Sequence, residues 1–374
     1  MDGAAQPAPE QPAGEPPAAP MRSVHTNNFP ELLAELGISL LVTTYQAGKV
    51  VFLRYEEGRL NTHFRDLPAP MGVALQGNRL AVGGPWSIWE FQNVPAVARK
   101  VEPAGRHDAC FLPRLLHVTG NVQIHEMAWV GDELWFVNTR FSCLCTRDLQ
   151  HSFVPRWRPP FVTALAPQDR CHLNGLGLVD GQIRYATALG VSDTPGGWRE
   201  HKKDGGVLLE VPGGEVVTRG LSMPHSPRWY ADRLWLLESG TGGLGVVDLA
   251  SGRYEPVAAL PGFTRGLDFF GPLAFVGLSQ VRETAVFSGI PITEQARERH
   301  CGVWVVDLRS GQVVAFVRFE DELQEIFGVQ VLPGIRYPEL LNDGKHELVA
   351  DSFVLSDEAL REAPPELLHV PDLQ

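Results

Sequence analysis

The sequence predicts an all-β fold, a six-bladed β-propeller, on three observations. A short apolar strand, a tight turn built on Gly or Asp, and a second apolar strand recur along the chain. The recurrences start roughly 40 to 60 residues apart, which is the spacing of propeller blades. The β pattern also opens with three strands and closes with one, so that two incomplete blades add up to one complete blade. The repeats begin at Met71, His125, Asn174, His225, Arg265 and, in degenerate form, Phe327.

The chain begins with a segment that differs from the rest. Residues 1–22 are rich in Pro, Ala and Gly and poor in large apolar side chains, which predicts a disordered tail. A short helix is expected over residues 28–37, where Asn28 can cap the first turn, Pro30 suits it, and Gly37 ends the helix. We expect this helix to cover the bottom or the side of the barrel.

The propeller itself is expected over residues 23–355. Its β pattern begins with three strands between Ser39 and Phe64, and a lone strand, Phe327–Leu332, ends it. Pairing the two ends of the chain in one blade closes the ring and leaves no blade incomplete. Beyond the propeller, Ser356 is suited to cap a short terminal helix, so residues 356–374 are expected to form a helix and a tail.

The bulk composition excludes several classes of function. The 374 residues carry a net charge of −12, which disfavours nucleic acid and anionic membranes as main partners. The N-terminus has neither the basic start nor the apolar core of a secretory signal, and no apolar run is long enough to span a membrane. The five cysteines show no disulfide or zinc spacing, so we expect buried free thiols. The sequence thus predicts a cytoplasmic protein.

Propeller topology predicts which residues share one end of the channel. The start of each innermost strand and the end of the second strand lie on the same face, here called the upper face. The first positions of the repeats should therefore form a ring at the upper mouth of the channel. Positions two residues earlier lie on the same strand face. The residues expected to converge there are His125, His172, His225, Asn174, Glu238, Glu325, Arg140 and Arg265.

Two chemistries fit this set of side chains. His125, His172 and His225 with the Glu238 carboxylate suit a borderline divalent metal such as Zn²⁺, Mn²⁺ or Fe²⁺. Alternatively, His125 or His225 acts as a general base while Arg265 steadies an oxyanion or a substrate carboxylate. The residues expected to contact the substrate are Asn174, Arg140, Trp198 and Tyr45. Polar side chains can also line a propeller channel only to bind water, and Glu126, on the other side of its strand, is expected to be structural.

Two long connections, 193–206 and 279–302, leave from the same face and are candidates for covers over a site. Trp86, Trp89 and Trp198 fall in loops predicted for this face, where they could stack on a sugar ring or a peptide. The glycine-rich segment 240–245 joins two strands and precedes no helix, so it lacks the helix N-terminus that binds phosphate. No nucleotide is expected.

The phrases LLVTTYQAGKVVFL, NTRFSCL and CHLNGLGL resemble those of an uncharacterised bacterial family, a domain of unknown function, over most of the chain. The six-bladed layout is similar to the gluconolactonase/regucalcin and NHL-type propellers. That resemblance implies a divalent cation at the channel mouth. The gluconolactonase pattern uses carboxylates and asparagine suited to Ca²⁺, and here only Asn174 matches it, with histidines at the other positions.

Two functions remain open from the sequence. The first is an enzyme, metal-assisted or acid/base, that acts on a small polar or sugar-like substrate in the upper mouth. The second is a non-catalytic propeller that presents its upper face to a peptide or protein partner. A bound metal would favour the first, and function retained after replacement of all three histidines would select the second.

Overall fold

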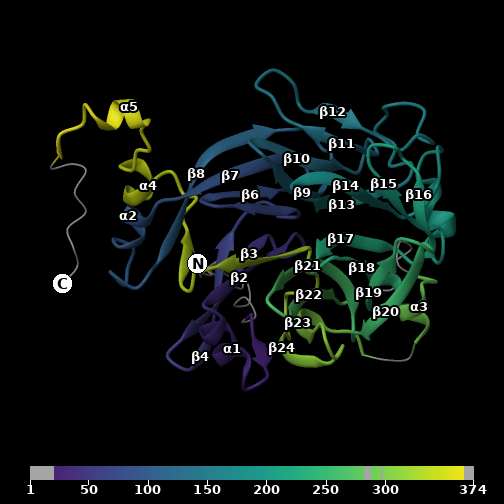
Figure 1. Cartoon of the computed structure of the whole chain (residues 1–374). Coiled ribbons are helices and arrows are strands. Elements are labelled where there is room, and N and C mark those ends of the chain that lie inside the picture. Colours follow the sequence, from purple (N-terminus) through teal and green to yellow (C-terminus); the bar gives the residue numbers. More distant parts are fainter. Residues whose placement is uncertain (1–20, 282–287, 296–297, 366–374) are drawn as a thin grey trace, which may run out of the picture.

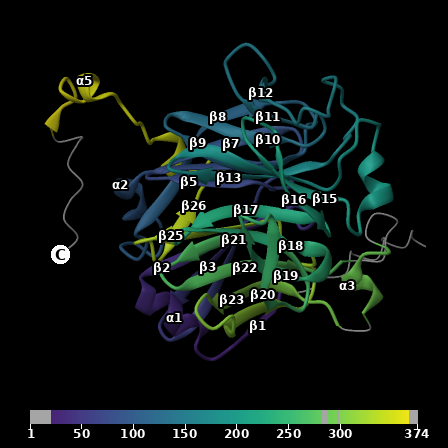
Figure 2. The ribbon, with the colours of Figure 1, turned by 45° about the vertical axis from the view of Figure 1, so that its right-hand side comes forward.

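The computed structural model of the chain describes residues 21–281, 288–295 and 298–365, which form six antiparallel blades around a central channel (Figure 1). The innermost strands are β25, β5, β9, β13, β17 and β21, and each contacts the next around the ring. The expected six-bladed β-propeller is confirmed, and Figure 2 shows the blades from a second direction.

The blades are numbered here in the order of their innermost strands around the channel. The first is β25 (Gly328–Pro333), β2 (Ile38–Thr44), β3 (Lys49–Glu56) and β4 (Arg59–Asp66). The second is β5 (Val73–Gln76), β6 (Arg79–Gly83), β7 (Ser87–Asn93) and β8 (Ala109–Val118), with β26 (Pro338–Leu340) at its edge. The third is β9 (Ile124–Val130), β10 (Glu133–Asn138), β11 (Cys143–Thr146) and β12 (Val154–Trp157).

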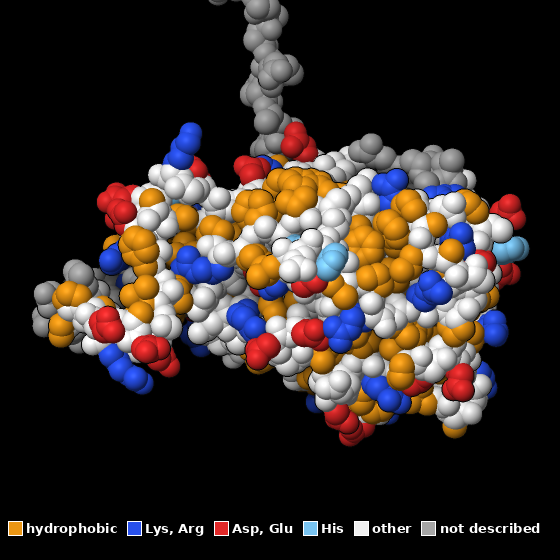
Figure 3. Space-filling model, turned by 90° about the horizontal axis from the view of Figure 1, so that it is seen from above, with side chains coloured by type: hydrophobic (Ala, Val, Ile, Leu, Met, Phe, Trp, Pro, Cys, Tyr) orange, Lys and Arg blue, Asp and Glu red, His pale blue; other side chains and the backbone are white. Residues whose placement is uncertain are grey.

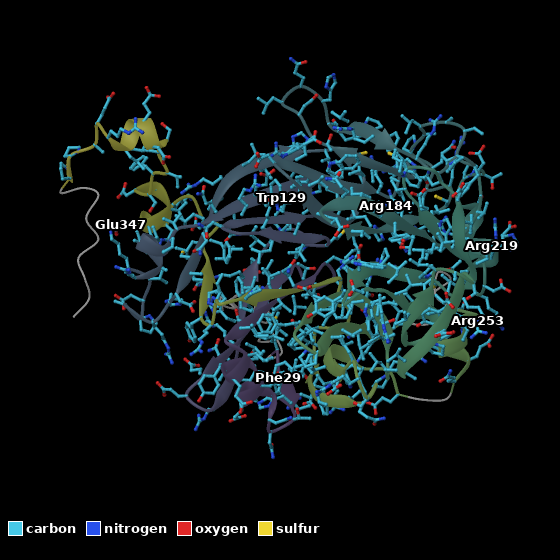
Figure 4. The ribbon with its side chains drawn as sticks, viewed as in Figure 1. Phe29, Trp129, Arg184, Arg219, Arg253 and Glu347 are labelled. Carbon is cyan, nitrogen blue, oxygen red and sulfur yellow. The ribbon has the colours of Figure 1, made fainter. Side chains whose placement is uncertain are left out.

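The remaining blades follow the same order from the channel outward. The fourth is β13 (Leu173–Val179), β14 (Gln182–Ala188), β15 (Gly206–Glu210) and β16 (Val216–Leu221). The fifth is β17 (Pro224–Tyr230), β18 (Arg233–Glu238), β19 (Gly243–Asp248) and β20 (Arg253–Ala259). The sixth is β21 (Phe263–Phe270), β22 (Leu273–Ser279), β23 (Cys301–Asp307) and β24 (Val313–Phe319), with β1 (Ser23–His25) at its edge. Figure 4 shows Arg219 and Arg253 at the outer side of the fourth and fifth blades.

The tight turns of the repeat have the backbone that two-residue hairpins require. Asp180 and Gly181 adopt φ angles of +50° and +71°, and Ala231 and Asp232 adopt +50° and +55°. Positive φ at both central positions matches the twist of the two strands. This requirement explains why Gly and Asp recur at the turn of each repeat in the sequence.

Both ends of the chain close the ring. Strand β25 pairs with β2 from Ile38 opposite Pro333 to Thr43 opposite Gly328, which confirms the predicted composite blade. Strand β1 adds a second closure, which was not predicted, because it extends the sixth blade by pairing with β24. Helix α1 (Phe29–Leu36) packs between these two blades, with Phe29 and Leu33 fully buried in their shared core (Figure 4). The helix thus seals the side of the barrel where the chain ends meet.

Four blades are also tied together inside the lower channel. Glu126 of β9 pairs with Arg228 of β17 at 3.0 Å and accepts hydrogen bonds from Ser226 and from the Leu176 backbone of β13. The Nε atom of Arg228 donates to the carbonyl oxygen of Leu267 in β21. Each polar atom of this network has a partner, as buried charges require. The contacts of Glu126 are therefore structural. Glu126 lines the lower pocket together with His125.

Two local expectations were wrong. Asn28 does not cap α1, because its side-chain amide donates to the Val314 carbonyl in the neighbouring blade. Trp89 lies in the middle of strand β7, stacked on Phe91, and not in an upper-face loop. The left-handed Gly37 that ends α1 and the Ser356 cap of α5 (Asp357–Leu360) are confirmed.

The termini differ in how they meet the barrel. The predicted tail lies outside the described residues up to position 20, whereas Arg22 already forms an ion pair with Asp321 at 2.9 Å. At the other end, α4 (Glu347–Ala350) lies beside α2 (Pro95–Ala98), and Leu348 and Val349 pack against its cluster. The segment with α5 projects away from the blades (Figures 1 and 2). The predicted 279–302 connection is described only in part, and it contains α3 (Pro291–Glu294).

Two further expectations concern cysteines and membranes. All five cysteines are buried and free, as predicted. Within the described ranges, no helix is both long enough and apolar enough to cross a membrane.

Candidate functional site

A pocket of about 400 Å³ occupies the upper mouth of the channel. Its wall contains six of the residues expected at the site, and it is otherwise mainly apolar. The predicted residues that line it are His125, His172, His225, Arg265, Trp198 and Tyr45. The other lining residues are Met71, Pro85, Asn121, Gln123, Asp169, Leu189, Arg199, Met223, Phe263 and Phe327. Repeat register therefore identified side chains that are up to 220 positions apart in the sequence and lie together in the fold (Tyr45 to Arg265).

A strained backbone residue precedes the innermost strand in four blades. Ala69, Gln123, His172 and Met223 occupy the equivalent position, two residues before the first position of the repeat, with φ angles of +43°, +55°, +50° and +47°. Residues other than glycine rarely adopt this left-handed conformation, and such strain concentrates at functional sites. In two of these blades the carbonyl at this position hydrogen-bonds the imidazole two residues later.

The tautomer of His125 follows from its hydrogen bonds. Its Nδ1 atom lies 3.1 Å from the carbonyl oxygen of Gln123 and 2.8 Å from the hydroxyl oxygen of Thr139. The Thr139 hydroxyl already donates its proton to the Leu173 carbonyl at 2.6 Å, so Thr139 can only accept here. Because both partners are acceptors, the proton must be on Nδ1. The lone pair of the neutral ring is then on Nε2.

His225 repeats this arrangement in the fifth blade. Its Nδ1 atom lies 2.9 Å from the carbonyl oxygen of Met223 and 2.8 Å from the hydroxyl oxygen of Ser239. A carbonyl can only accept, so Nδ1 again carries the proton and Nε2 the lone pair. Ser239 follows the second strand of its blade at the place that Thr139 holds in the third blade. Two blades therefore present the same imidazole in the same chemical form.

His172 is held by a carboxylate. Its Nδ1 atom lies 3.0 and 3.1 Å from the two oxygens of Asp169, which also accept from the indole nitrogen of Trp198 at 2.9 Å and from Arg199 at 3.4 Å. The ring of His172 lies between Trp198 and His125, with ring centroids 4.5 and 4.8 Å away. Asp169 therefore orients His172 and leaves its Nε2 atom without a partner among the described side chains.

Burial and nearby positive charge keep two of the imidazoles neutral. Burial lowers the pKa of His125 well below its usual 6.5, and the nearby His172 and Arg265 lower it further. Burial likewise lowers the pKa of His225, with Arg265 as the next cause. Both rings are almost inaccessible to solvent, at 5% and 4% exposure. At neutral pH they are proton acceptors.

Arg265 is the one cation that faces the pocket without an ion pair in the described part of the chain. Its guanidinium carbon lies 3.7 Å from the centre of the Phe327 ring, and its buried Nε atom has no hydrogen-bond partner. Burial lowers the pKa of Arg265, although Tyr45 and Glu325 oppose this effect. Tyr45 donates its hydroxyl to Glu325, and burial raises the pKa of Tyr45 to about 12.

Four expected residues do not line this pocket, and one of them, Glu325, lies beside it and accepts the hydroxyl of Tyr45. Asn174 is fully buried, where its amide accepts from Thr187 and donates to the Pro224 carbonyl, so it ties two blades together. Glu238 bonds the Ser222 backbone and Thr241 beside the outer strands. Arg140 lies beside the rim, where its guanidinium reaches the Asn121 carbonyl at 3.5 Å.

Asp169 was not among the predicted residues, although it contacts His172, Trp198 and Arg199 in the pocket. It stands three positions before His172, in a loop with a φ angle of +49°, so no strand register pointed to it. The signal available was the spacing Asp-x-x-His next to a repeat start. Such a pair is significant only once the turn that joins it is known.

The resemblance to calcium-binding propellers can be tested against the donor atoms present. That class needs several oxygen ligands, whereas Asn174 is engaged elsewhere, Glu238 is remote, and Arg265 adds a positive charge to the pocket. The residues therefore do not fit a calcium-type site. Within the described ranges, no three His, Cys, Asp or Glu side chains are grouped so that they could hold a metal ion. Binding of Zn²⁺, Mn²⁺ or Fe²⁺ stays a prediction.

The fold is that of a six-bladed propeller, and it has a pocket at the upper mouth of the channel. Residues 27–341 match the domain of unknown function DUF4915, and the chain belongs to that family. No curated protein matches it. A structure described as a nidogen/laminin complex is similar with a TM-score of 0.51 at 10% identity, over 80% of this chain and 99% of that one. A Bacteroides caccae protein of unknown function is similar with a TM-score of 0.51 at 9% identity, over 79% and 98%. These likenesses concern the fold alone.

Proposed function

We propose that the protein is an acid/base enzyme that acts on a small molecule bound in the upper pocket. The observation that carries this proposal is that three imidazoles of one pocket have their Nδ1 atoms engaged by internal acceptors. All three Nε2 atoms are thereby left to a ligand. A site that only holds water has no need of three rings fixed in one tautomer.

The roles of the rings follow from their surroundings. His172, oriented by the Asp169 carboxylate, is the residue that exchanges a proton with the substrate, as carboxylate-oriented imidazoles do in other enzymes. His125 touches His172 edge to face and is held neutral, so it accepts the second proton or hydrogen bond. His225 offers a further acceptor. Trp198 covers His172 and Asp169 and excludes water from that side.

The shape of the site supports a small molecule over a protein partner. A volume of about 400 Å³ is in the range of small-ligand sites. A peptide or protein that only lies across the upper face would not need the buried imidazoles. The scaffold function remains the alternative that the following experiment distinguishes.

The test detects proton transfer directly, without knowledge of the whole reaction. The full chain is incubated in D₂O with a panel of small acids, lactones and esters, and deuterium incorporation and turnover are followed by NMR. We expect activity on at least one member, and we expect His172→Asn to reduce it about 100-fold or more. His151→Asn, at an exposed position, is the matched control and should change nothing.

Three outcomes would count against the proposal. One is the absence of exchange and turnover across the panel, which would favour the scaffold function. Another is full activity in both His172→Asn and His125→Asn, which would assign the acid/base chemistry to other residues. The third is a stoichiometric metal in protein purified without chelator or nickel, lost on replacing the histidines. That result would replace simple acid/base chemistry with metal assistance.

A further inference from the structure

The charge balance of the upper pocket is incomplete. Among the described residues that line it, Asp169 is the one carboxylate, and Arg199 and His172 already engage it. Glu325, which approaches from beside the pocket, accepts the hydroxyl of Tyr45. The guanidinium of Arg265 forms no ion pair within the described residues, and its buried Nε atom has no acceptor at all.

A buried donor without an acceptor is costly. Leaving such a group unpaired loses the free energy of its hydrogen bonds to water without replacement, and the loss is larger when the group is charged. The face of Phe327 compensates only in part, because a ring attracts a cation but accepts no in-plane hydrogen bond from it. An arrangement that a folded protein retains at this cost points to a ligand that supplies the missing acceptor.

The other residues of the pocket wall indicate the polarity of the rest of that ligand. Met71, Leu189, Met223, Phe263 and Phe327 form a largely apolar surface around the polar groups. A polyhydroxylated sugar would have to bury several hydroxyl groups against this surface without partners. An apolar group would instead bind favourably, because burial against this surface removes its apolar area from water.

We propose that the upper pocket binds a small organic acid with one carboxylate group, held by Arg265, and an apolar body, held by the Met, Leu and Phe side chains. The inference rests on the proposed function for the identity of the site, and it names the substrate class. A planar guanidinium suits a carboxylate, which can accept two parallel hydrogen bonds from it.

The number of charges on the ligand follows from the same balance. One guanidinium neutralises one negative charge, and His125 and His225 are neutral at physiological pH. A phosphate monoester or a dicarboxylate would bring a second negative charge into an apolar wall with no cation left to meet it. The site therefore selects monoanions.

The experiment measures binding by calorimetry on the full chain at pH 7.5. The probes are butyrate, hexanoate, benzoate and phenylacetate, each with its neutral amide, together with gluconate and phenyl phosphate. We expect at least one apolar monocarboxylate to bind 10- to 100-fold more tightly than its amide. Gluconate and phenyl phosphate should bind more weakly than that acid.

Variants locate the effect. Arg265→Met should lose the preference for acid over amide, and Arg265→Lys should retain only part of it because an ammonium lacks the planar fork. Arg253→Gln, at an exposed position on the outer edge of the fifth blade, is the control and should bind as the parent does. Arg265→Met should also melt at the same or a higher temperature, since it removes a guanidinium whose buried Nε atom has no acceptor.

Several results would overturn the inference. These are equal binding of acid and amide, no detectable binding of any monocarboxylate, tighter binding of gluconate or phenyl phosphate, or unchanged preference in Arg265→Met. A large drop in the melting temperature of Arg265→Met would also contradict it, because Arg265 would then be structural. Binding of a monocarboxylate without proton exchange would reject the proposed function and leave this inference intact. Proton exchange on a neutral substrate alone would support the proposed function and reject this inference.

Discussion

At the residue scale, three histidines with similar positions differ in what holds them. His125 and His225 bond a carbonyl two residues back and a hydroxyl from the neighbouring strand, whereas His172 bonds a carboxylate. Repeat register predicted that the three would meet, because it depends only on strand periodicity. It could not predict their tautomers, since these depend on the left-handed backbone at Gln123, His172 and Met223, which no apolar pattern encodes.

The buried neutral histidines make stability depend on pH. His125 and His225 have folded-state pKa values below the ordinary 6.5, so below about pH 6.5 the unfolded chain binds more protons than the folded one. Their contribution is fully present above that pH and is lost progressively as the pH falls from about 6.5 toward their lower folded-state pKa values. We expect the melting temperature to fall between pH 7.5 and 5.5, and to fall less in the double variant His125→Asn, His225→Asn.

Comparing the parent protein with the double variant separates the titration of His125 and His225 from that of other groups. Burial raises the pKa of Asp268 to about 6, which acts in the opposite direction over part of the same range. That term is present in both proteins and cancels in the difference. Identical pH profiles for the parent and the double variant would contradict the assignment of neutral buried imidazoles.

At the element scale, strand β25 completes the first blade although it comes from the far end of the sequence. It pairs with β2 over six positions, and Asp268 of β21 also accepts hydrogen bonds from Gln330 and the Val331 backbone within it. The missing first strand at one end and the single strand at the other made this pairing predictable. The additional strand β1 was not predictable, because three residues are too few to show a period.

A chain that ends at Ile326 should therefore fail to fold. The truncation strips the innermost strand from the first blade and exposes the apolar surface of the neighbouring blades to water. Circular dichroism should show no cooperative melting. As a control, a chain that ends at Leu355 lacks only the projecting segment and should melt as the full chain does. A soluble, cooperatively melting chain that ends at Ile326 would contradict the closure.

At the scale of the whole molecule, two pockets occupy opposite ends of the channel. His125 and Phe327 line both of them and so mark the boundary between the upper site and the lower network of Glu126 and Arg228. On the face seen in Figure 3, acidic and basic side chains are interspersed, and the net charge of the chain is −12. At about 0.1 M salt the repulsion between this net negative charge and an anion is largely screened beyond about 10 Å, so recognition of a carboxylate depends on the local charge of Arg265.

The sequence predicted this architecture better than it predicted the contents of the site. Blade order, ring closure and five of the pocket residues follow from the repeat, and Trp198 follows from the long connection 193–206 at the same face. The repeat does not predict the place of Asp169 in the pocket, nor that Asn174 and Glu238 lie outside it. These positions depend on loop geometry and on contacts between blades. Side chains in loops carry much of the chemistry, and their positions are determined only in the folded molecule.

The most direct test of the central claim is the proton position on the imidazole rings of the ligand-free protein. Two-bond ¹H–¹⁵N correlation spectra of the full chain at pH 7.5, assigned with single His→Asn variants, distinguish the two tautomers and the imidazolium. We expect the proton of His125 and of His225 on Nδ1 with Nε2 unprotonated, and we expect His172 to carry a proton on Nδ1. Protonated Nε2 atoms on His125 and His225 would contradict the account, because these two rings could then accept neither a proton nor a hydrogen bond from a ligand at Nε2.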